Sequence, residues 1–179
     1  MHSVPGAGVD VTLAAHDLAH NTPDAVFPNN WFSTHLGSEA EGATGEDTLV
    51  LYPMKCPNRA AERRPDLVSV LRGRGYPRVV DFSDKEARNV HFEGTGVLVL
   101  DRPRGVAYVS ISERADAGAA DEWAAALGYR DIVKFGSFGA GGHPVYHTNV
   151  MMAVGTGVAI VCGEAVRDAK ERQHLLVRC

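Results

Sequence analysis

The sequence predicts an α/β protein built from a repeated unit, and two observations support this prediction. A polar motif, a strand, a tight turn, a second strand and a helix follow one another three times along the chain. The polar motifs centre on Asn30, Glu93 and His147, at intervals of 63 and 54 residues, which is typical of repeated supersecondary units. One unit cannot bury its sheet alone, so we expect the units to pack around a common axis with their polar motifs facing it.

Composition favours one domain over residues 1–179, with units at about 22–82, 89–135 and 145–179. The 45% hydrophobic and 22% charged residues are enough for one core. A net charge of -4 gives no extended positive face, so we expect no nucleic-acid partner. No apolar run has membrane-spanning length, and three scattered cysteines indicate a reducing compartment. We therefore expect a cytoplasmic protein with no membrane segment.

Local patterns place the elements of each unit. Asn58 is expected to cap one helix, and Pro65 to lie in the first turn of the next. Gly128 is expected to end a helix in the left-handed conformation, and a last helix to begin at Glu164. The expected strands are 9–13, 48–52, 78–82, 97–100, 106–111, 132–135, 151–154 and 158–162, and the expected helices include 66–72 and 119–127.

Two motifs that resemble metal or phosphate sites are not interpreted as such. His16 and His20, with an aspartate between them, superficially resemble a zinc-protease helix. The aspartate is a methylene shorter than the glutamate that this motif needs, Pro23 leaves hardly more than one turn, and no third ligand is signalled. The glycine run 136–142 lacks a Lys-Ser or Lys-Thr ending and does not lead into a helix, so it is a poor phosphate cradle. No metal or cofactor is expected.

The stretch 22–35 interleaves an acid, two amides and a histidine with large apolar side chains. If Asp24 is buried, it needs a cationic or donating partner, and Pro23 and Pro28 fix the backbone around it. We interpret the stretch as one wall of a polar pocket. A half-buried strand with a solvated turn is the alternative.

Together the three motifs suggest a site for a planar, nitrogen-rich ligand. Asp24 and Glu93 are candidate carboxylates, because two oxygens match the donor fork of a guanidinium group. His147 is the candidate general acid and base, since the pKa of histidine lies nearest neutrality. This hypothesis requires the three motifs to meet in space.

The motifs also carry a family resemblance. The stretches 23–35, 51–54, 92–96 and 146–152 resemble the amidinotransferase, or guanidino-group-modifying, superfamily, and most closely its citrulline-hydrolase-like, arginine-deiminase-related branch. The similarity extends from about Val9 to Arg167. It implies a pentein-type α/β propeller of ββαβ units with the active site on its axis, of which this chain would hold about three of five blades.

The resemblance also implies roles for particular residues. Asp24 would bind the guanidino or ureido nitrogens of the substrate, Glu93 would hold the same group from the other side, and His147 would transfer protons. Asn30 and Asn149 lie where relatives often have an acid, which favours a neutral ureido substrate. The expected substrate is a small guanidino or ureido amino acid such as arginine or citrulline.

The nucleophile is the main departure from the family. Members use a cysteine thiolate in a last blade, after a glycine-rich run, to attack the central carbon of the substrate. This chain has no such run. Cys179 follows Arg178 as in the family motif, but without the glycines. Cys56 beside Lys55 is a second candidate, and Cys162 follows an apolar strand that is typical of an inert core thiol.

Two hypotheses of different classes follow. In the first, the chain is a cysteine-dependent hydrolase of the C–N bond in arginine, citrulline or a similar amino acid. In the second, it is a truncated, inactive relative or a fragment that at most binds such a ligand. A truncated propeller would expose unpaired strand edges, so we expect self-association through them.

Overall fold

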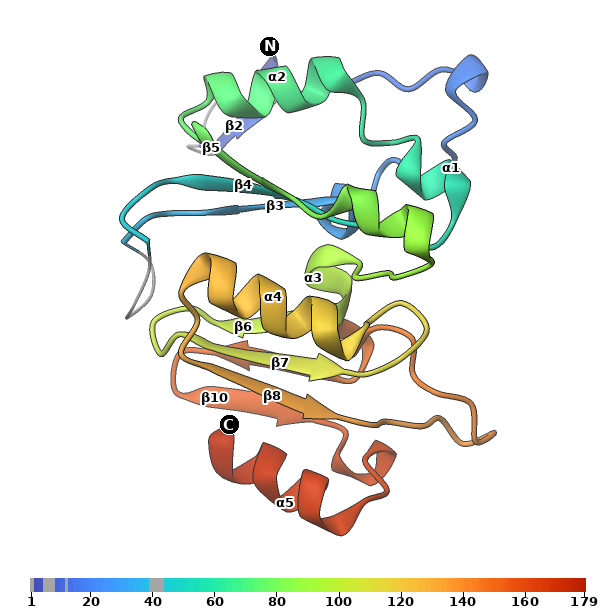
Figure 1. Cartoon of the computed structure of the whole chain (residues 1–179), viewed down its shortest axis with the longest axis vertical. Coiled ribbons are helices and arrows are strands. Elements are labelled where there is room, and N and C mark those ends of the chain that lie inside the picture. The colour runs from blue at the N-terminus through green and yellow to red at the C-terminus, as the bar shows by residue number, and fades with distance from the viewer. Residues whose placement is uncertain (1, 5–8, 12, 39–43) are drawn as a thin grey trace.

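A computed structural model describes residues 2–4, 9–11, 13–38 and 44–179. Figure 1 shows α/β units that follow one another along the long axis, from α2 near the N-terminal end to α5 at the C-terminal end. A two-stranded antiparallel sheet of β1 (His2–Val4) and β2 (Val9–Val11) precedes them. In the described part of the chain, no helix is long and apolar enough to span a bilayer.

The first three-stranded sheet has the order β3-β4-β5. Strand β3 pairs antiparallel with β4, and β4 pairs parallel with β5. The strands are β3 (Phe32–His35), β4 (Thr48–Leu51) and β5 (Arg78–Asp81). Helices α1 (Pro57–Ala60) and α2 (Pro65–Gly73) form the crossover between the parallel pair, and η3 (Ser83–Arg88) follows β5.

The second sheet repeats this topology in the order β6-β7-β8, with an antiparallel hairpin and then a parallel strand. Its strands are β6 (Leu98–Asp101), β7 (Val106–Ser110) and β8 (Asp131–Phe135). Helix α4 (Ala117–Leu127) is the crossover. The Asp116 carboxylate accepts from Ala119 N–H at its start, and Gly128, at φ 73°, closes its end in the left-handed conformation.

The third unit begins in the same way with an antiparallel hairpin of β9 (Met152–Gly155) and β10 (Val158–Val161). It continues through η5 (Gly163–Ala165) into α5 (Ala169–Arg178). Each hairpin is preceded by a short helix: η2 (Pro28–Asn30), α3 (Gly94–Val97) and η4 (Thr148–Val150). The predicted order of motif, hairpin and helix is thus present three times, and the fold is α/β.

Two of the predicted helix starts are wrong. The residue that caps α1 is Cys56, and Asn58 lies inside that helix. The last helix begins at Ala169 and not at Glu164, because the Asp168 carboxylate accepts from two backbone N–H groups of its first turn. The strand predicted over 9–13 is β2, which ends at Val11, and residue 12 lies outside the described residues.

Shared cores join successive units. Buried Val50 and Tyr52 of the first unit pack with Val97 and Trp123 of the second. The Trp123 indole N–H donates to the Tyr52 hydroxyl at 2.9 Å, and that hydroxyl lies 2.6 Å from Ser33 Oγ. A second cluster joins β7 and β8 to β9 and α5. Because the cores cross the unit boundaries, the position of one unit fixes the position of the next.

Candidate active site

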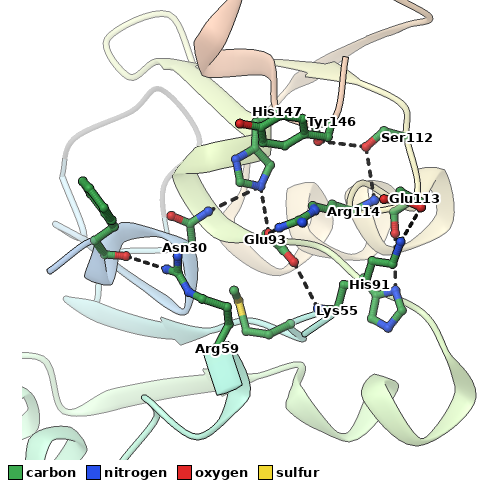
Figure 2. Close-up of polar contacts among 12 residues, drawn as sticks. Asn30, Lys55, Arg59, His91, Glu93, Ser112, Glu113, Arg114, Tyr146 and His147 are labelled. Atoms are coloured by element: carbon green, nitrogen blue, oxygen red, sulfur yellow. Dashed lines mark hydrogen bonds and ion pairs between the residues drawn. The ribbon is translucent and has the colours of Figure 1, made fainter. Parts of the chain in front are cut away.

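The short helices before the hairpins bring three of the predicted residues together. Asn30 ends η2, Glu93 precedes α3 and His147 precedes η4. All three side chains are buried. Figure 2 shows Asn30, Glu93 and His147 converging from three different parts of the chain. Three polar groups far apart in sequence therefore share one environment.

The hydrogen bond between Glu93 and His147 is the centre of this cluster. Glu93 Oε2 lies 2.8 Å from His147 Nε2, while Asn30 Nδ2 lies 3.4 Å from the same ring nitrogen. We assign the proton to Nε2, because the carboxylate can only accept and is the nearer partner. In this tautomer Nδ1 is the ring nitrogen that can accept a proton.

Glu93 is fully buried, but its charge is well compensated. Lys55 N–H donates to Oε1 at 3.0 Å, and an Arg114 guanidinium nitrogen lies 3.2 Å from Oε2. Burial alone would raise the pKa of Glu93. The hydrogen bond from His147, that from Lys55 N–H and the Arg114 charge outweigh burial, so the pKa is lowered. Glu93 is consequently a carboxylate at neutral pH.

Arg114 is a site residue that the motif search missed. Its guanidinium lies 5.3 Å from the Tyr146 ring centroid in a cation–π contact. Its Nε is buried without a hydrogen-bond partner. Burial lowers the pKa of Arg114, but the Glu93 charge prevails and raises it. A cation with a free donor next to Glu93 could pair with an anionic group of a ligand.

Two glycines let α3 approach the neighbouring motifs. Gly94 has a φ of 45°, and a Cβ there would lie 2.5 Å from the Asn29 carbonyl oxygen. A Cβ on Gly96 would lie 2.6 Å from Asn30 Nδ2 and 2.9 Å from His147 Nδ1. The two glycines after Glu93 are therefore needed for the close packing of α3 against Asn29, Asn30 and His147.

Gly96→Ala is expected to displace the His147 ring or the Asn30 amide and to disrupt the bond to Glu93. We expect about 1–3 kcal/mol lower stability and at least tenfold weaker ligand binding, measured by chemical unfolding and calorimetry. Gly73→Ala is the matched control, since its Cβ would meet no atom within 4 Å. Equal effects of the two substitutions would contradict the role given to Gly96.

Asp24 and Asn149 lie at the margin of the cluster. Asp24 is exposed in the turn before η2, and Asn149 is exposed on η4, two residues after His147. The residues on either side of Asp24 line an apolar hollow of about 1060 Å³ together with Trp31 and Leu71. The burial that the sequence analysis considered for Asp24 is not observed.

Glu62 is a second residue that the motif search missed. The Glu62 side chain is fully buried, and the charges of Asp24 and Glu93 both raise its pKa. Glu62 follows α1 and lies within range of the charge of Glu93, which is distant in the sequence. A lone glutamate in an Arg-rich stretch gives no sequence signal that its side chain is buried.

The three cysteines have different surroundings. Cys179 ends α5 beside Tyr108, Arg104 and Asp101, and burial raises its pKa. Cys162 is exposed after β10. Cys56 is half-buried next to Lys55, whose N–H donates to Glu93. Cys56 is thus one residue from a backbone group that binds Glu93, whereas Cys179 is surrounded by groups other than Glu93 and His147.

The two histidines of the rejected zinc motif have other partners. His16 Nδ1 lies 2.8 Å from Thr22 Oγ1, and His20 Nδ1 accepts from Asp17 N–H at 3.0 Å as part of a capping box on η1 (Leu18–His20). Among the residues that the structure describes, no three His, Cys, Asp or Glu side chains gather in a group that could hold a metal ion.

Solved structures with the same fold include an arginine dihydrolase and a dimethylarginine dimethylaminohydrolase. The substrate-bound N-terminal domain of ArgZ, a cyanobacterial arginine dihydrolase, has a TM-score of 0.65 at 19% identity, over 88% of this chain and 51% of that one. AgrE with ornithine and NAD⁺ has a TM-score of 0.64 at 18% identity, over 88% and 20%. At these identities the likeness shows the fold.

A dimethylarginine dimethylaminohydrolase, solved as an adduct with 4-chloro-2-hydroxymethylpyridine, has a TM-score of 0.56 at 16% identity, over 86% of this chain and 54% of that one. The chain spans about half the length of this enzyme and of the ArgZ domain, and about a fifth of full-length ArgZ. No curated protein sequence matches it.

Fold and motifs together define a protein of the pentein, or guanidino-group-modifying, superfamily, which confirms the resemblance drawn from the sequence. Residues 2–178 match the family described as N,N-dimethylarginine dimethylhydrolase, eukaryotic. The chain belongs to that family.

Proposed function

We propose that this chain binds a guanidino or ureido amino acid, such as arginine or citrulline, at Glu93 and His147, as part of a hydrolase acting on a C–N bond of that group. The observation that carries the proposal is the buried 2.8 Å hydrogen bond between Glu93 and His147, with Asn30 beside it. A carboxylate that is charged at neutral pH, next to an imidazole, suits a ligand that needs both an anionic partner and proton transfer.

Each residue has a proposed role. Glu93 holds the N–H groups of the ligand, and His147 moves protons between the departing nitrogen and water. Asp24 contacts the same group from the solvent side, while Asn30 and Asn149 supply neutral hydrogen-bonding groups that suit a ureido oxygen. Arg114 takes the α-carboxylate, because it is the cation next to Glu93 with a donor not yet used.

We further propose that the chain forms about three blades of a five-bladed propeller. The repeated hairpin and crossover topology supports this, as does a length about half that of the ArgZ domain. The units of about 22–82, 89–135 and 145–179 would be the blades of one domain. The cytoplasmic location inferred from the cysteines stays a prediction.

A second candidate function, ligand binding without turnover, is favoured by the surroundings of the cysteines. Cys179 packs beside Tyr108 at the end of α5, and Cys162 lies after β10. A thiol must reach the central carbon of the ligand for the hydrolytic reaction. Cys56 is the cysteine adjacent in sequence to Lys55, whose N–H donates to Glu93.

Ammonia release from arginine and from citrulline, together with calorimetric binding of both, tests the proposal. The expected result is binding of at least one ligand that is lost in His147→Phe. Turnover that survives Cys179→Ser but not Cys56→Ser would identify the nucleophile as Cys56, and the reverse pattern would identify Cys179. Binding without ammonia release would establish the second candidate, and absence of binding would refute both.

We also propose that the chain self-associates through the free edge of β10. Strands β4 and β7 each carry a parallel third strand, whereas β10 pairs with β9 alone among the described residues. Val158 and Ile160 on β10 are 57% and 71% exposed. An apolar, unpaired edge of this kind invites strand pairing with a second copy.

Sedimentation velocity over a range of protein concentrations is expected to show a dimer or larger species. Ile160→Lys should shift the chain to monomer, because a charge on an edge strand opposes pairing. Leu18→Lys, at a fully exposed leucine far from β10 in sequence, is the control and should change nothing. A monomer at all concentrations would contradict the proposal.

A further inference from the structure

Glu62 is a buried acid whose hydrogen-bonding capacity is unused. Its side chain is fully buried, and neither Oε1 nor Oε2 has a hydrogen-bond partner. Arg59 Nε lies 3.0 Å from Oε1 as an ion pair, but that N–H is not aimed at the oxygen and also lacks a hydrogen bond. Leaving a buried carboxyl group in this state is costly.

Arg59 itself is held by other contacts. One of its terminal nitrogens donates to the Phe27 carbonyl oxygen at 2.8 Å, which ties α1 to the segment before η2. Figure 2 shows Arg59 rising from α1 toward the side of the cluster that holds Asn30. Arg59 therefore cannot turn to satisfy both Glu62 oxygens without releasing Phe27.

Glu62 lies on the η2 side of the candidate site, because its ion-pair partner Arg59 also binds the Phe27 carbonyl just before η2 (Figure 2). Asp24 and Glu93 both act on it, and Arg59 is the only cation among the groups that shift its pKa. Burial is the largest cause and raises the pKa, and Arg59 compensates in part, so that the pKa rises from 4.5 to about 7. Asp24 and Glu93, from different segments, thus both act on Glu62, whose two oxygens accept no hydrogen bond.

We propose that Glu62 is a specificity-determining carboxylate that pairs with a cationic guanidinium ligand and favours it over a neutral ureido one. This inference rests on the proposed function. The planar fork of a guanidinium can donate to two oxygens at once. A ureido group presents a carbonyl oxygen in place of one donor and carries no charge, so it gains less from an additional carboxylate.

The binding of a cation next to Glu62 also displaces the proton of this group. The O–H bond of the carboxyl breaks, the proton passes to solvent, and the carboxylate accepts from the ligand N–H groups. Affinity for arginine should therefore rise by about tenfold between pH 6 and pH 8. Below its pKa Glu62 must lose a proton before it can pair with the ligand, whereas above its pKa it is already a carboxylate. Affinity for citrulline should change much less over this range.

Calorimetric titration of the full chain and of Glu62→Gln with arginine and citrulline tests the inference. For arginine at pH 8 we expect on the order of tenfold to a hundredfold weaker binding in the variant, and a pH dependence reduced to within about twofold. Citrulline binding should change by less than about threefold. Glu164→Gln, at an exposed glutamate of η5, is the matched control and should leave both ligands unaffected.

Thermal unfolding without ligand shows whether Glu62→Gln folds and whether the buried Glu62 destabilises the folded chain. Since the folded-state pKa lies above the unfolded value of 4.5, ionisation favours the unfolded chain as pH rises from 4.5 to 7. The variant should therefore melt at a higher temperature than the unaltered chain at pH 8, and this gain should vanish at pH 4. No gain at pH 8 would show that Arg59 already satisfies Glu62, and would overturn the inference.

The binding outcomes separate this inference from the proposed function. If the unaltered chain binds neither arginine nor citrulline, both fail. If it binds citrulline but not arginine, or if Glu62→Gln weakens both ligands equally with an unchanged pH profile, the proposed function stands. In those cases Glu62 is only a structural partner of Arg59.

Discussion

Glu93→Ala is expected to weaken the binding of arginine or citrulline at least a hundredfold and to lower the free energy of unfolding by about 3 kcal/mol. The substitution removes the acceptor of His147 Nε2 and Lys55 N–H and the counter-charge of Arg114. It leaves a partly buried guanidinium without its nearest anion. Calorimetry and urea unfolding at pH 7.5 measure the two effects.

The pH dependence of this stability loss is a further check. The pKa of Glu93 is lowered in the folded protein, so its stabilising contribution is present above the unfolded pKa of about 4.5. It is lost as pH falls through the folded-state pKa. The stability difference between the unaltered chain and Glu93→Gln should accordingly shrink in acid.

Glu113→Gln is the control for Glu93→Ala, because Glu113 is an exposed acid that pairs with the Lys55 ammonium group nearby. An exposed ion pair contributes at most about 1 kcal/mol. Equal losses in the Glu93 and Glu113 variants would show that general negative charge, and not the buried carboxylate, supports the ligand.

Trp123→Ala is expected to lower the free energy of unfolding by about 3–5 kcal/mol. Trp123 is fully buried in the core that joins the first two units, and its indole N–H donates to Tyr52. The substitution leaves a cavity and removes a donor between the units. Because Asn30 and Glu93 come from these two units, their cluster should loosen as well.

Urea unfolding measures the loss in Trp123→Ala, and Trp123→Phe separates its two causes. The phenylalanine variant keeps most of the apolar contact and loses only the bond to Tyr52, which can still bond to Ser33. We expect a smaller loss, of about 1–2 kcal/mol. Leu176→Ala, at a leucine on α5 that is 53% exposed, should change stability by less than about 0.5 kcal/mol.

The sequence predicted most of the secondary structure because the signals are local. The αL position of Gly128, the place of Pro65 in the first turn of α2 and the alternation of strands with tight turns are set by the residues themselves. The helix starts at Pro57 and Ala169 were missed, since several polar residues near each could act as a cap. Choosing among equal caps depends on packing that the local sequence does not contain.

The residues of the candidate site were also predicted only in part. The sequence predicted that Asp24, Glu93 and His147 meet, with Asn30 as a further ligand-binding residue. The structure brings Asn30, Glu93 and His147 together and leaves Asp24 exposed. Arg114 and Glu62 were missed because charged residues outside a motif are normally solvated.

The sequence by itself determined the repeated α/β unit and the polar residue that opens each one, because both depend on short-range patterns. Only the tertiary structure decided which charges are withdrawn from water. Burial of Glu93 depends on how α3 packs against η2 and η4 across unit boundaries. The free energy of a buried charge such as that of Glu93 or Glu62 is set by groups distant in sequence. The exposed position of Asp24 was decided at the same level.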